Sequence, residues 1–100
     1  MGLGPTPYGN STTLDVTATQ VIKAGSGTVY KITVVTAGSG GSLTLNDVLT
    51  VNAAASANAV ITIPNASLTQ GAIVTLEWPF QVGIVISAIP TGAQLSLSYA

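Results

Sequence analysis

The stretch that decides the fold is AIVTLEWPFQVGIVISAIPTGAQLSLSYA, from Ala72 to Ala100. Apolar and polar side chains alternate along three runs within it, which cover residues 74–80, 82–86 and 95–99. Such period-2 alternation turns one face of a β-strand toward a core. We therefore predict three short strands joined by two tight connections, with Trp78 and Phe80 among their core residues. Pro79 lacks a backbone donor, so it should mark a strand end, a bulge or an edge.

Five further strand patterns precede this stretch, separated by turns rich in Gly, Pro, Asn and Ser. They cover residues 12–19, 20–24, 28–36, 43–47 and 58–64. In the third pattern, Tyr30, Ile32 and Val34 share one face, and Val29, Lys31, Thr33 and Val35 share the other. Residues 48–57 include a short alanine run, which is too short to form a stable helix alone, so we expect a surface turn there.

About eight strands at spacings of roughly 8–12 residues, with no helix, indicate a β-sandwich or small barrel. We predict an all-β fold, a single-domain antiparallel β-sandwich that resembles a jelly roll. A seven-stranded immunoglobulin-like sandwich is the alternative, although its cysteine pair is absent. We place the sandwich at residues 12–100, after an extended Gly/Pro-rich N-terminal arm at residues 1–11.

The composition is apolar and almost uncharged. Of the 100 residues, 47% are hydrophobic and only 5% are charged, whereas about 25% of a typical domain is charged. A surface made of Ser, Thr, Asn and Gly packs readily against other subunits, because few charges need desolvation. Few charges also leave few devices that protect strand edges, which a subunit held inside an assembly would not need.

Several partners and chemistries are disfavoured by what the chain contains. Its only basic residues are Lys23 and Lys31, too few for phosphate-backbone binding, so we expect no nucleic acid partner. Polar residues interrupt the long uncharged run, so we expect no membrane span. The chain has no His and no Cys, which removes thiol nucleophiles, imidazole bases and the usual zinc ligands.

The three acids, Asp15, Asp47 and Glu77, fall at outward-facing or strand-end positions of the predicted strands. Nothing in the sequence brings two of them to the spacing that glycoside hydrolysis requires. The glycine-rich segment at residues 37–42 precedes a strand pattern instead of a helix, so we expect a hairpin loop and not a phosphate cradle. We therefore predict no enzyme activity and no catalytic, cofactor or metal site.

Four motifs mark the second half of the chain: Ile63-Pro64-Asn65, Trp78-Pro79, Gly83-Ile84-Val85-Ile86, and Thr91-Gly92 followed by an alternating run to Tyr99. Together with the alanine-rich stretch that begins at Ala53, they resemble a group of small virion proteins of tailed bacteriophages. The resemblance covers about half of the chain. It implies that Trp78, Pro79, Phe80 and Gly83 are structural core markers.

The resemblance also implies a function. It suggests a non-enzymatic decoration or cement protein that binds the major capsid protein on the outer surface of the phage head, often as a homotrimer. Such a virion protein would be assembled in the host cytoplasm. The N-terminal arm, with Leu3, Pro5, Pro7 and Tyr8, is then the candidate capsid-contacting segment.

A tail-fibre or baseplate module that binds host-surface glycan is the alternative. It would need an exposed aromatic platform for a sugar, and Trp78 beside Pro79 and Phe80 is the candidate. The alternation of the strand favours a core position for Trp78, which argues for the decoration protein.

Overall fold

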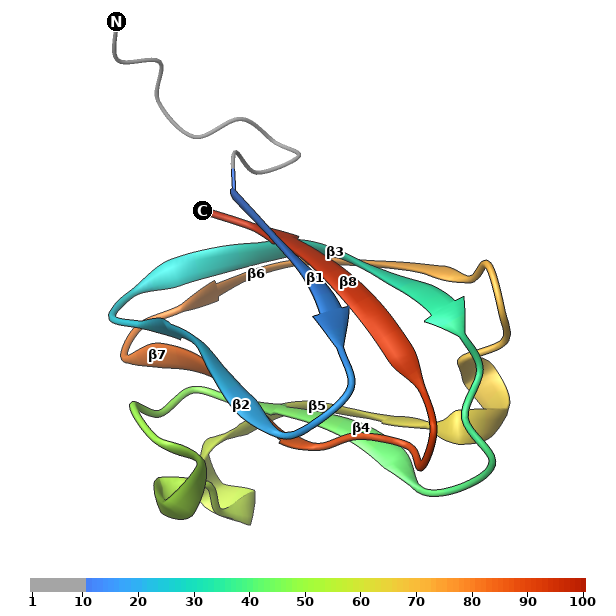
Figure 1. The fold of residues 1–100 in the computed structure, drawn as a ribbon. Helices are drawn as coiled ribbons and strands as arrows, with labels where there is room; N and C mark the ends of the chain where they lie inside the picture. The colour runs from blue at the N-terminus through green and yellow to red at the C-terminus, as the bar shows by residue number, and fades with distance from the viewer. Residues whose placement is uncertain (1–10) are drawn as a thin grey trace, which may run out of the picture.

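The structure, a computed structural model, describes residues 11–100. Across these residues the chain forms two β-sheets packed face to face (Figure 1). The strands are β1 Ser11–Val16, β2 Gln20–Ala24, β3 Gly27–Thr36, β4 Ser42–Asn46, β5 Ala59–Pro64, β6 Ile73–Phe80, β7 Gly83–Ala88 and β8 Gln94–Tyr99. Single 3-10 turns lie in the connections, at η1 Val51–Ala53, η2 Ser56–Asn58 and η3 Asn65–Ser67.

The strand order is that of a jelly roll. Sheet I has the order β1-β8-β3-β6 and sheet II the order β2-β7-β4-β5, and every pair is antiparallel. The first strand pairs with the last, the second with the seventh, the third with the sixth and the fourth with the fifth. This nested pairing is a long hairpin rolled up into two sheets. The prediction of an eight-stranded antiparallel sandwich is confirmed, and the seven-stranded alternative is not.

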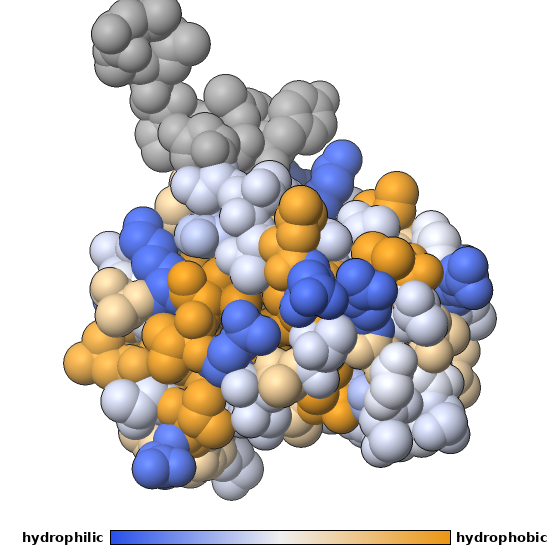
Figure 2. Space-filling model, viewed as in Figure 1, coloured by the Kyte–Doolittle hydropathy of each residue, from blue (hydrophilic) through white to orange (hydrophobic). Residues whose placement is uncertain are grey.

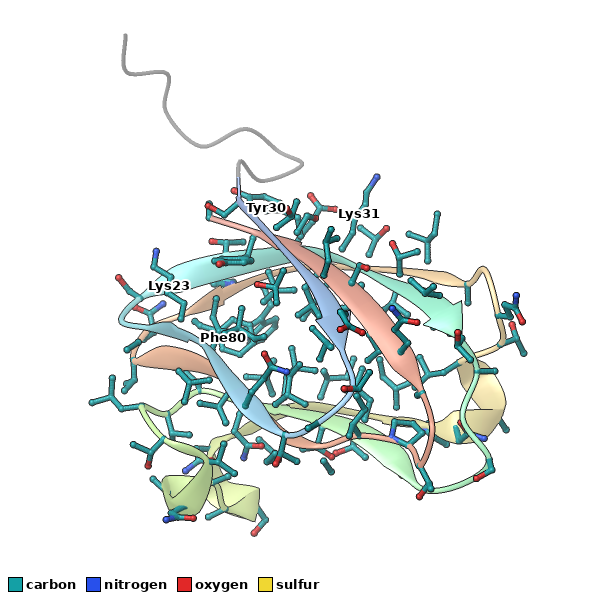
Figure 3. The ribbon with its side chains drawn as sticks, viewed as in Figure 1. Lys23, Tyr30, Lys31 and Phe80 are labelled. Atoms are coloured by element: carbon teal, nitrogen blue, oxygen red, sulfur yellow. The ribbon has the colours of Figure 1, made fainter. Side chains whose placement is uncertain are left out.

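The core lies between the two sheets and is made of aliphatic side chains and one phenylalanine. Phe80 is 1% exposed, and Figure 3 shows its ring in the space between the sheets. Its fully buried neighbours are Val16, Val29, Ile32, Leu43, Leu45, Ile84, Ile86 and Leu95. Each such side chain stabilises the fold by about 1.5–3 kcal/mol relative to exposure. The prediction that Phe80 is a core residue is therefore confirmed.

Most predicted strands occur where the sequence pattern indicated. The strand at 20–24 is reproduced residue for residue, and the ambiguous residues 48–57 form 3-10 turns instead of a helix. The three C-terminal strands also form, but consecutive ones belong to different sheets, with β6 and β8 in sheet I and β7 in sheet II. The segment at 37–42 likewise connects the two sheets, so its prediction as a hairpin loop is wrong.

The prediction that Trp78 lies in the core is wrong, because its side chain is 50% exposed. Trp78 pairs with the buried Val29, and residues that pair across antiparallel strands lie on the same face of the sheet. Trp78 is therefore on the face that covers the core. However, β6 is an edge strand of sheet I, its register shifts just before Trp78, and Glu77 there has a φ of 49°. With a neighbouring strand on one side only, the large indole is left half in solvent.

The prediction for Pro79 is confirmed. This residue lies in the edge strand β6, one position before its last residue and beside the irregular register at Glu77. Proline is tolerated on an edge strand because its missing N–H can face the open side, where no neighbouring strand needs a donor.

The alternation predicted for β3 is also interrupted. Ile32 and Val34 are buried, but Val29, which was predicted on the opposite face, is buried as well, while Tyr30 is only partly so. The register of β3 shifts between Val29 and Lys31 against both neighbouring strands, which changes the parity of the residues before the shift. Alternation counted along the sequence assumes an unbroken pleat and misses such a shift.

Gly83 begins β7 at a point where three segments of backbone meet. A β-carbon at this position would collide with the carbonyl oxygen of Val48 and lie 3.2 Å from the carbonyl oxygen of Lys23. Both obstacles are backbone atoms, which cannot rotate away as a side chain can. Only glycine allows this approach, which explains why the Gly83 motif serves the architecture of the sandwich.

Replacing Gly83 by alanine should destabilise the fold, because the added methyl group must push the backbones apart. We expect Gly83→Ala to lower the free energy of unfolding by about 1–3 kcal/mol. Urea unfolding followed by the fluorescence of the only tryptophan measures this difference. Gly40→Ala is the control, since a β-carbon there has no atom within 4 Å. Equal losses in both variants would contradict the explanation.

Candidate functional site

The glycine-rich segment at residues 37–42 is held from two sides by backbone and side-chain hydrogen bonds. The Asn65 side chain donates to the Gly38 carbonyl at 3.2 Å, and the Asn65 amide donates to the Gly41 carbonyl at 3.0 Å. The Thr91 amide donates to the Gly40 carbonyl at 3.0 Å, and the Ser39 amide donates to the Thr91 carbonyl at 2.9 Å. The motifs around Asn65 and Thr91 thus fasten one end of the sandwich, and the loop's carbonyls are occupied by the protein itself.

A polar cluster lies where β4 and β7 meet the η1–η2 segment. Its centre is Asn46, which is only 2% exposed. Its side-chain amide donates to the Ala55 carbonyl at 3.0 Å and to Asn58 Oδ1 at 2.6 Å, and its Oδ1 accepts from the Ser87 hydroxyl at 2.6 Å. Because every buried polar group of Asn46 has a partner, the cluster fixes the η1–η2 segment against sheet II.

A shallow depression of about 460 Å³ lies beside this cluster, on the outer face of sheet II. Its lining consists of small apolar and hydroxyl residues: Thr44, Asn46, Val51, Ala54, Ala55, Ser56, Ala59, Thr62 and Ser87. The Thr44 and Thr62 hydroxyls share a hydrogen bond of 3.1 Å across neighbouring strands. The lining carries no charge and no aromatic ring, so it offers shape and hydroxyl groups but no strong anchor for a small ligand.

Asp47 closes the connection between β6 and β7. Its carboxylate accepts hydrogen bonds from the backbone amides of Gln81 at 2.9 Å, Val82 at 2.7 Å and Gly83 at 3.2 Å. Partial burial acts to raise the pKa of this carboxyl group, but the three amide donors outweigh it and the pKa is lowered below its ordinary value. Asp47 is therefore a charged structural residue that links the end of β4 to the turn before β7.

The other two acids lie on opposite edges of sheet I. Asp15 is in β1 and accepts a hydrogen bond from the Gln94 side chain at 3.2 Å, and Glu77 is in β6. Three strand spacings separate β1 from β6, which is about 14 Å. That separation exceeds the range of a paired-carboxylate hydrolase site. Across residues 11–100, no group of three or more acidic, His or Cys side chains could hold a metal ion.

The outer face of sheet I carries hydroxyl groups around Lys31. One row crosses all four strands, with Thr12 opposite Ser98, Ser98 opposite Lys31 and Lys31 opposite Thr75. Figure 3 shows the Lys31 side chain pointing away from the sandwich. The hydroxyl groups of this row can satisfy hydrogen bonds with a partner without the desolvation cost of a charge.

The next row of the same face ends in large apolar side chains. Thr33 lies opposite both Ser96 and Ile73, and Ile73 is 63% exposed on the edge strand β6. Leu14 is 71% exposed on the other edge strand, β1. Leu14 lines a depression of about 180 Å³ together with residues of both rows. We call this surface, defined by Thr12, Leu14, Lys31, Thr33, Ile73, Thr75, Ser96 and Ser98, the sheet I face.

Apolar exposure is not confined to the sheet I face. Val21, Val35, Leu49, Trp78 and Val82 are also between 41% and 52% exposed. Figure 2 shows apolar side chains reaching the surface at several places on the side that carries β1 and β2, interspersed with strongly hydrophilic residues and with pale areas of intermediate hydropathy. No helix among the described residues is long and apolar enough to cross a membrane.

The sequence-based site predictions have different outcomes. The arm residues Leu3, Pro5, Pro7 and Tyr8 lie outside the described residues. Among the core markers, Phe80 and Gly83 are buried, Pro79 lies on an edge and Trp78 is exposed. Sequence reasoning named neither Leu14 nor Ile73 as a candidate contact. Alternation groups Leu14 with the buried Val16, but a bulge separates these two residues, and Ile73 falls on the outward face of its strand, where no residue was singled out. Comparisons with protein family models, curated proteins and solved structures find no match for this chain.

Replacing Asp47 by asparagine tests its structural role and its charge. At pH 7 we expect Asp47→Asn to lower the free energy of unfolding by about 1 kcal/mol, because an amide accepts on one oxygen only. The pKa of Asp47 is lowered in the folded state, so its charge stabilises the fold above the unfolded-state pKa of about 3.9. That stabilisation is lost as the pH falls through the folded-state pKa.

The difference between wild type and Asp47→Asn should therefore shrink as the pH falls from about 5 toward the folded-state value. Urea unfolding at a series of pH values measures it. Asp15→Asn is the control, since the exposed Asp15 carboxylate accepts one side-chain hydrogen bond instead of three backbone ones. A difference that stays constant down to pH 2 would contradict the role of the charge.

Proposed function

We propose that this chain is a non-enzymatic structural protein of a tailed-bacteriophage virion, which binds the outer surface of the capsid as a homotrimer and stabilises the head. The observation that carries the proposal is the sheet I face, a hydroxyl-rich surface with exposed Leu14 and Ile73 at its two edges. Its one charge is Lys31. The resemblance of the Pro64, Trp78, Gly83 and Thr91 motifs to phage virion proteins supports the same function.

The mechanism is mechanical. A decoration protein adds buried area across the junctions between capsid subunits, and that area resists the pressure of the packaged genome. A stable interface buries about 800 Å² on each partner, and a hydroxyl-rich face loses little on desolvation. Three linked subunits convert a weak contact into several simultaneous ones, which raises the overall affinity. The arm residues Leu3, Pro5, Pro7 and Tyr8 would extend each contact onto the capsid.

Charged substitutions on the sheet I face test the proposal. Ile73→Asp and Leu14→Asp should each weaken binding to expanded capsids of the phage that encodes this chain at least tenfold, because an uncompensated carboxylate would be desolvated at the interface. Co-sedimentation with the capsids measures binding, and analytical ultracentrifugation measures the mass of the free protein.

Thr62→Asp is the matched control, since Thr62 is exposed on the outer face of sheet II. Wild-type protein that remains a monomer and fails to sediment with capsids would refute the proposed function. A loss of binding that occurs only with Thr62→Asp would refute the assignment of the contact to sheet I.

The half-exposed indole of Trp78 favours a second candidate function, a tail-fibre or baseplate module that binds host-surface glycan. Aromatic faces in contact with solvent are what a sugar ring packs against, and Trp78 is 50% exposed. Trp78→Phe should then weaken binding to host cell-wall polysaccharide several-fold, and the polysaccharide should shift wild-type tryptophan fluorescence. Leu49→Ala, at a similarly exposed apolar residue, is the control. Unchanged fluorescence at saturating polysaccharide would exclude this function.

A further inference from the structure

Each of the four edge strands contains an extra residue that disturbs its pairing. In β1, the three steps from Thr13 to Val16 lie opposite two steps of β8. In β6, the three steps from Thr75 to Trp78 lie opposite two steps of β3. In sheet II, β2 has one residue more than the paired segment of β7, and β5 has one more than the paired segment of β4. Interior pairs also contain register shifts, but only on edge strands does the disturbed backbone face an open side.

Charge coincides with these irregularities. Asp15 lies in the bulge of β1 and Glu77 in that of β6, and both side chains are exposed. Lys23 directly follows the extra residue of β2. Three of the five charged residues of the chain are thus placed at edge irregularities. On the fourth edge, the last residue of β5 is Pro64, which has no donor to offer.

The backbone at the two acids is unusual as well. Asp15 has a φ of 57° and Glu77 a φ of 49°, and these are the non-glycine residues with positive φ among residues 11–100. A non-glycine residue in this region is strained, so the surrounding structure maintains a conformation that a regular strand would not have. At both positions the edge cannot present the flat, evenly spaced donors and acceptors that a further strand needs.

An open, regular and apolar edge strand is a template for pairing with another chain. This chain has the composition for such pairing, since its strands are rich in apolar residues and the chain is almost uncharged. We infer that the edges of sheet I are closed to strand pairing with a second copy of this chain, and that Asp15 and Glu77 are the residues that close them. Copies of the chain that associate then do so through sheet faces or strand connections. The inference does not depend on the proposed function.

Paired substitutions at positions 15 and 77 test the inference. The Asp15→Asn/Glu77→Asn variant removes both charges, and asparagine is the non-glycine residue best suited to positive φ, so the fold is retained. The Asp15→Val/Glu77→Val variant removes the charges and also disfavours the positive φ. We expect the average particle mass of both variants to increase at least tenfold from dilute to concentrated protein, and the increase to be larger for the valine variant. The particle mass of the wild type should not change with concentration. Light scattering and sedimentation measure the mass.

The Asp15→Lys/Glu77→Lys variant is the matched control, because a charge of either sign protects an edge. It should hold the wild-type mass. If the particle mass of the lysine variant increased as much as that of the valine variant, the inference would be overturned. Such a result would mean that the acids act through specific ion pairs and not by placing a charge on the edge. A fixed mass for the folded asparagine variant would overturn it as well, even if the valine variant failed to fold. Hydrogen exchange should show new protection of the β1 and β6 amides in the enlarged species, and its absence would overturn edge pairing.

Discussion

The pairing of the first strand with the last is the constraint on which the rest of the structure depends. β1 lies beside β8, and β8 lies beside β3, so the two ends of the described chain meet within sheet I. The remaining pairs nest inside this one, and the core forms only when all of them are made. Contacts this distant in sequence form late and slowly, because the loop entropy must be overcome before they stabilise anything.

Although charged residues are scarce, most of them protect strand edges, which the low percentage of charge did not suggest. With 5% charged residues, we expected few devices to protect the strand edges. That expectation is wrong, because a bulge interrupts every edge strand and Asp15, Lys23 and Glu77 lie at three of them. Asp47 serves the fold from within a turn. Lys31 remains as the one charge on the sheet I face, which leaves that face suited to contact with other protein surfaces.

The sequence predicted the fold class well and the surface poorly, for one physical reason. Alternation reports which residues share a face, and turn residues report where strands end, so the strands and the sandwich could be predicted. Trp78 was misplaced because a bulge and an edge position decide its exposure, and neither changes the residue pattern. Leu14 was grouped with the buried Val16 for the same reason, since a bulge separates the two residues. Gly83 was recognised as a marker, but the backbone approach of Val48 that requires glycine is visible only in three dimensions.

The sequence by itself determined an all-β chain of about eight short strands, without the His and Cys residues that many zinc sites and nucleophilic catalysts use. It also determined a surface dominated by hydroxyl and small apolar side chains, because so few charges exist to cover it. Only the tertiary structure decided which strands pair, which edges carry the charges and which apolar side chains remain in solvent. These properties depend on register between strands distant in sequence, and a shift of one residue on one strand reverses the face that its side chains present.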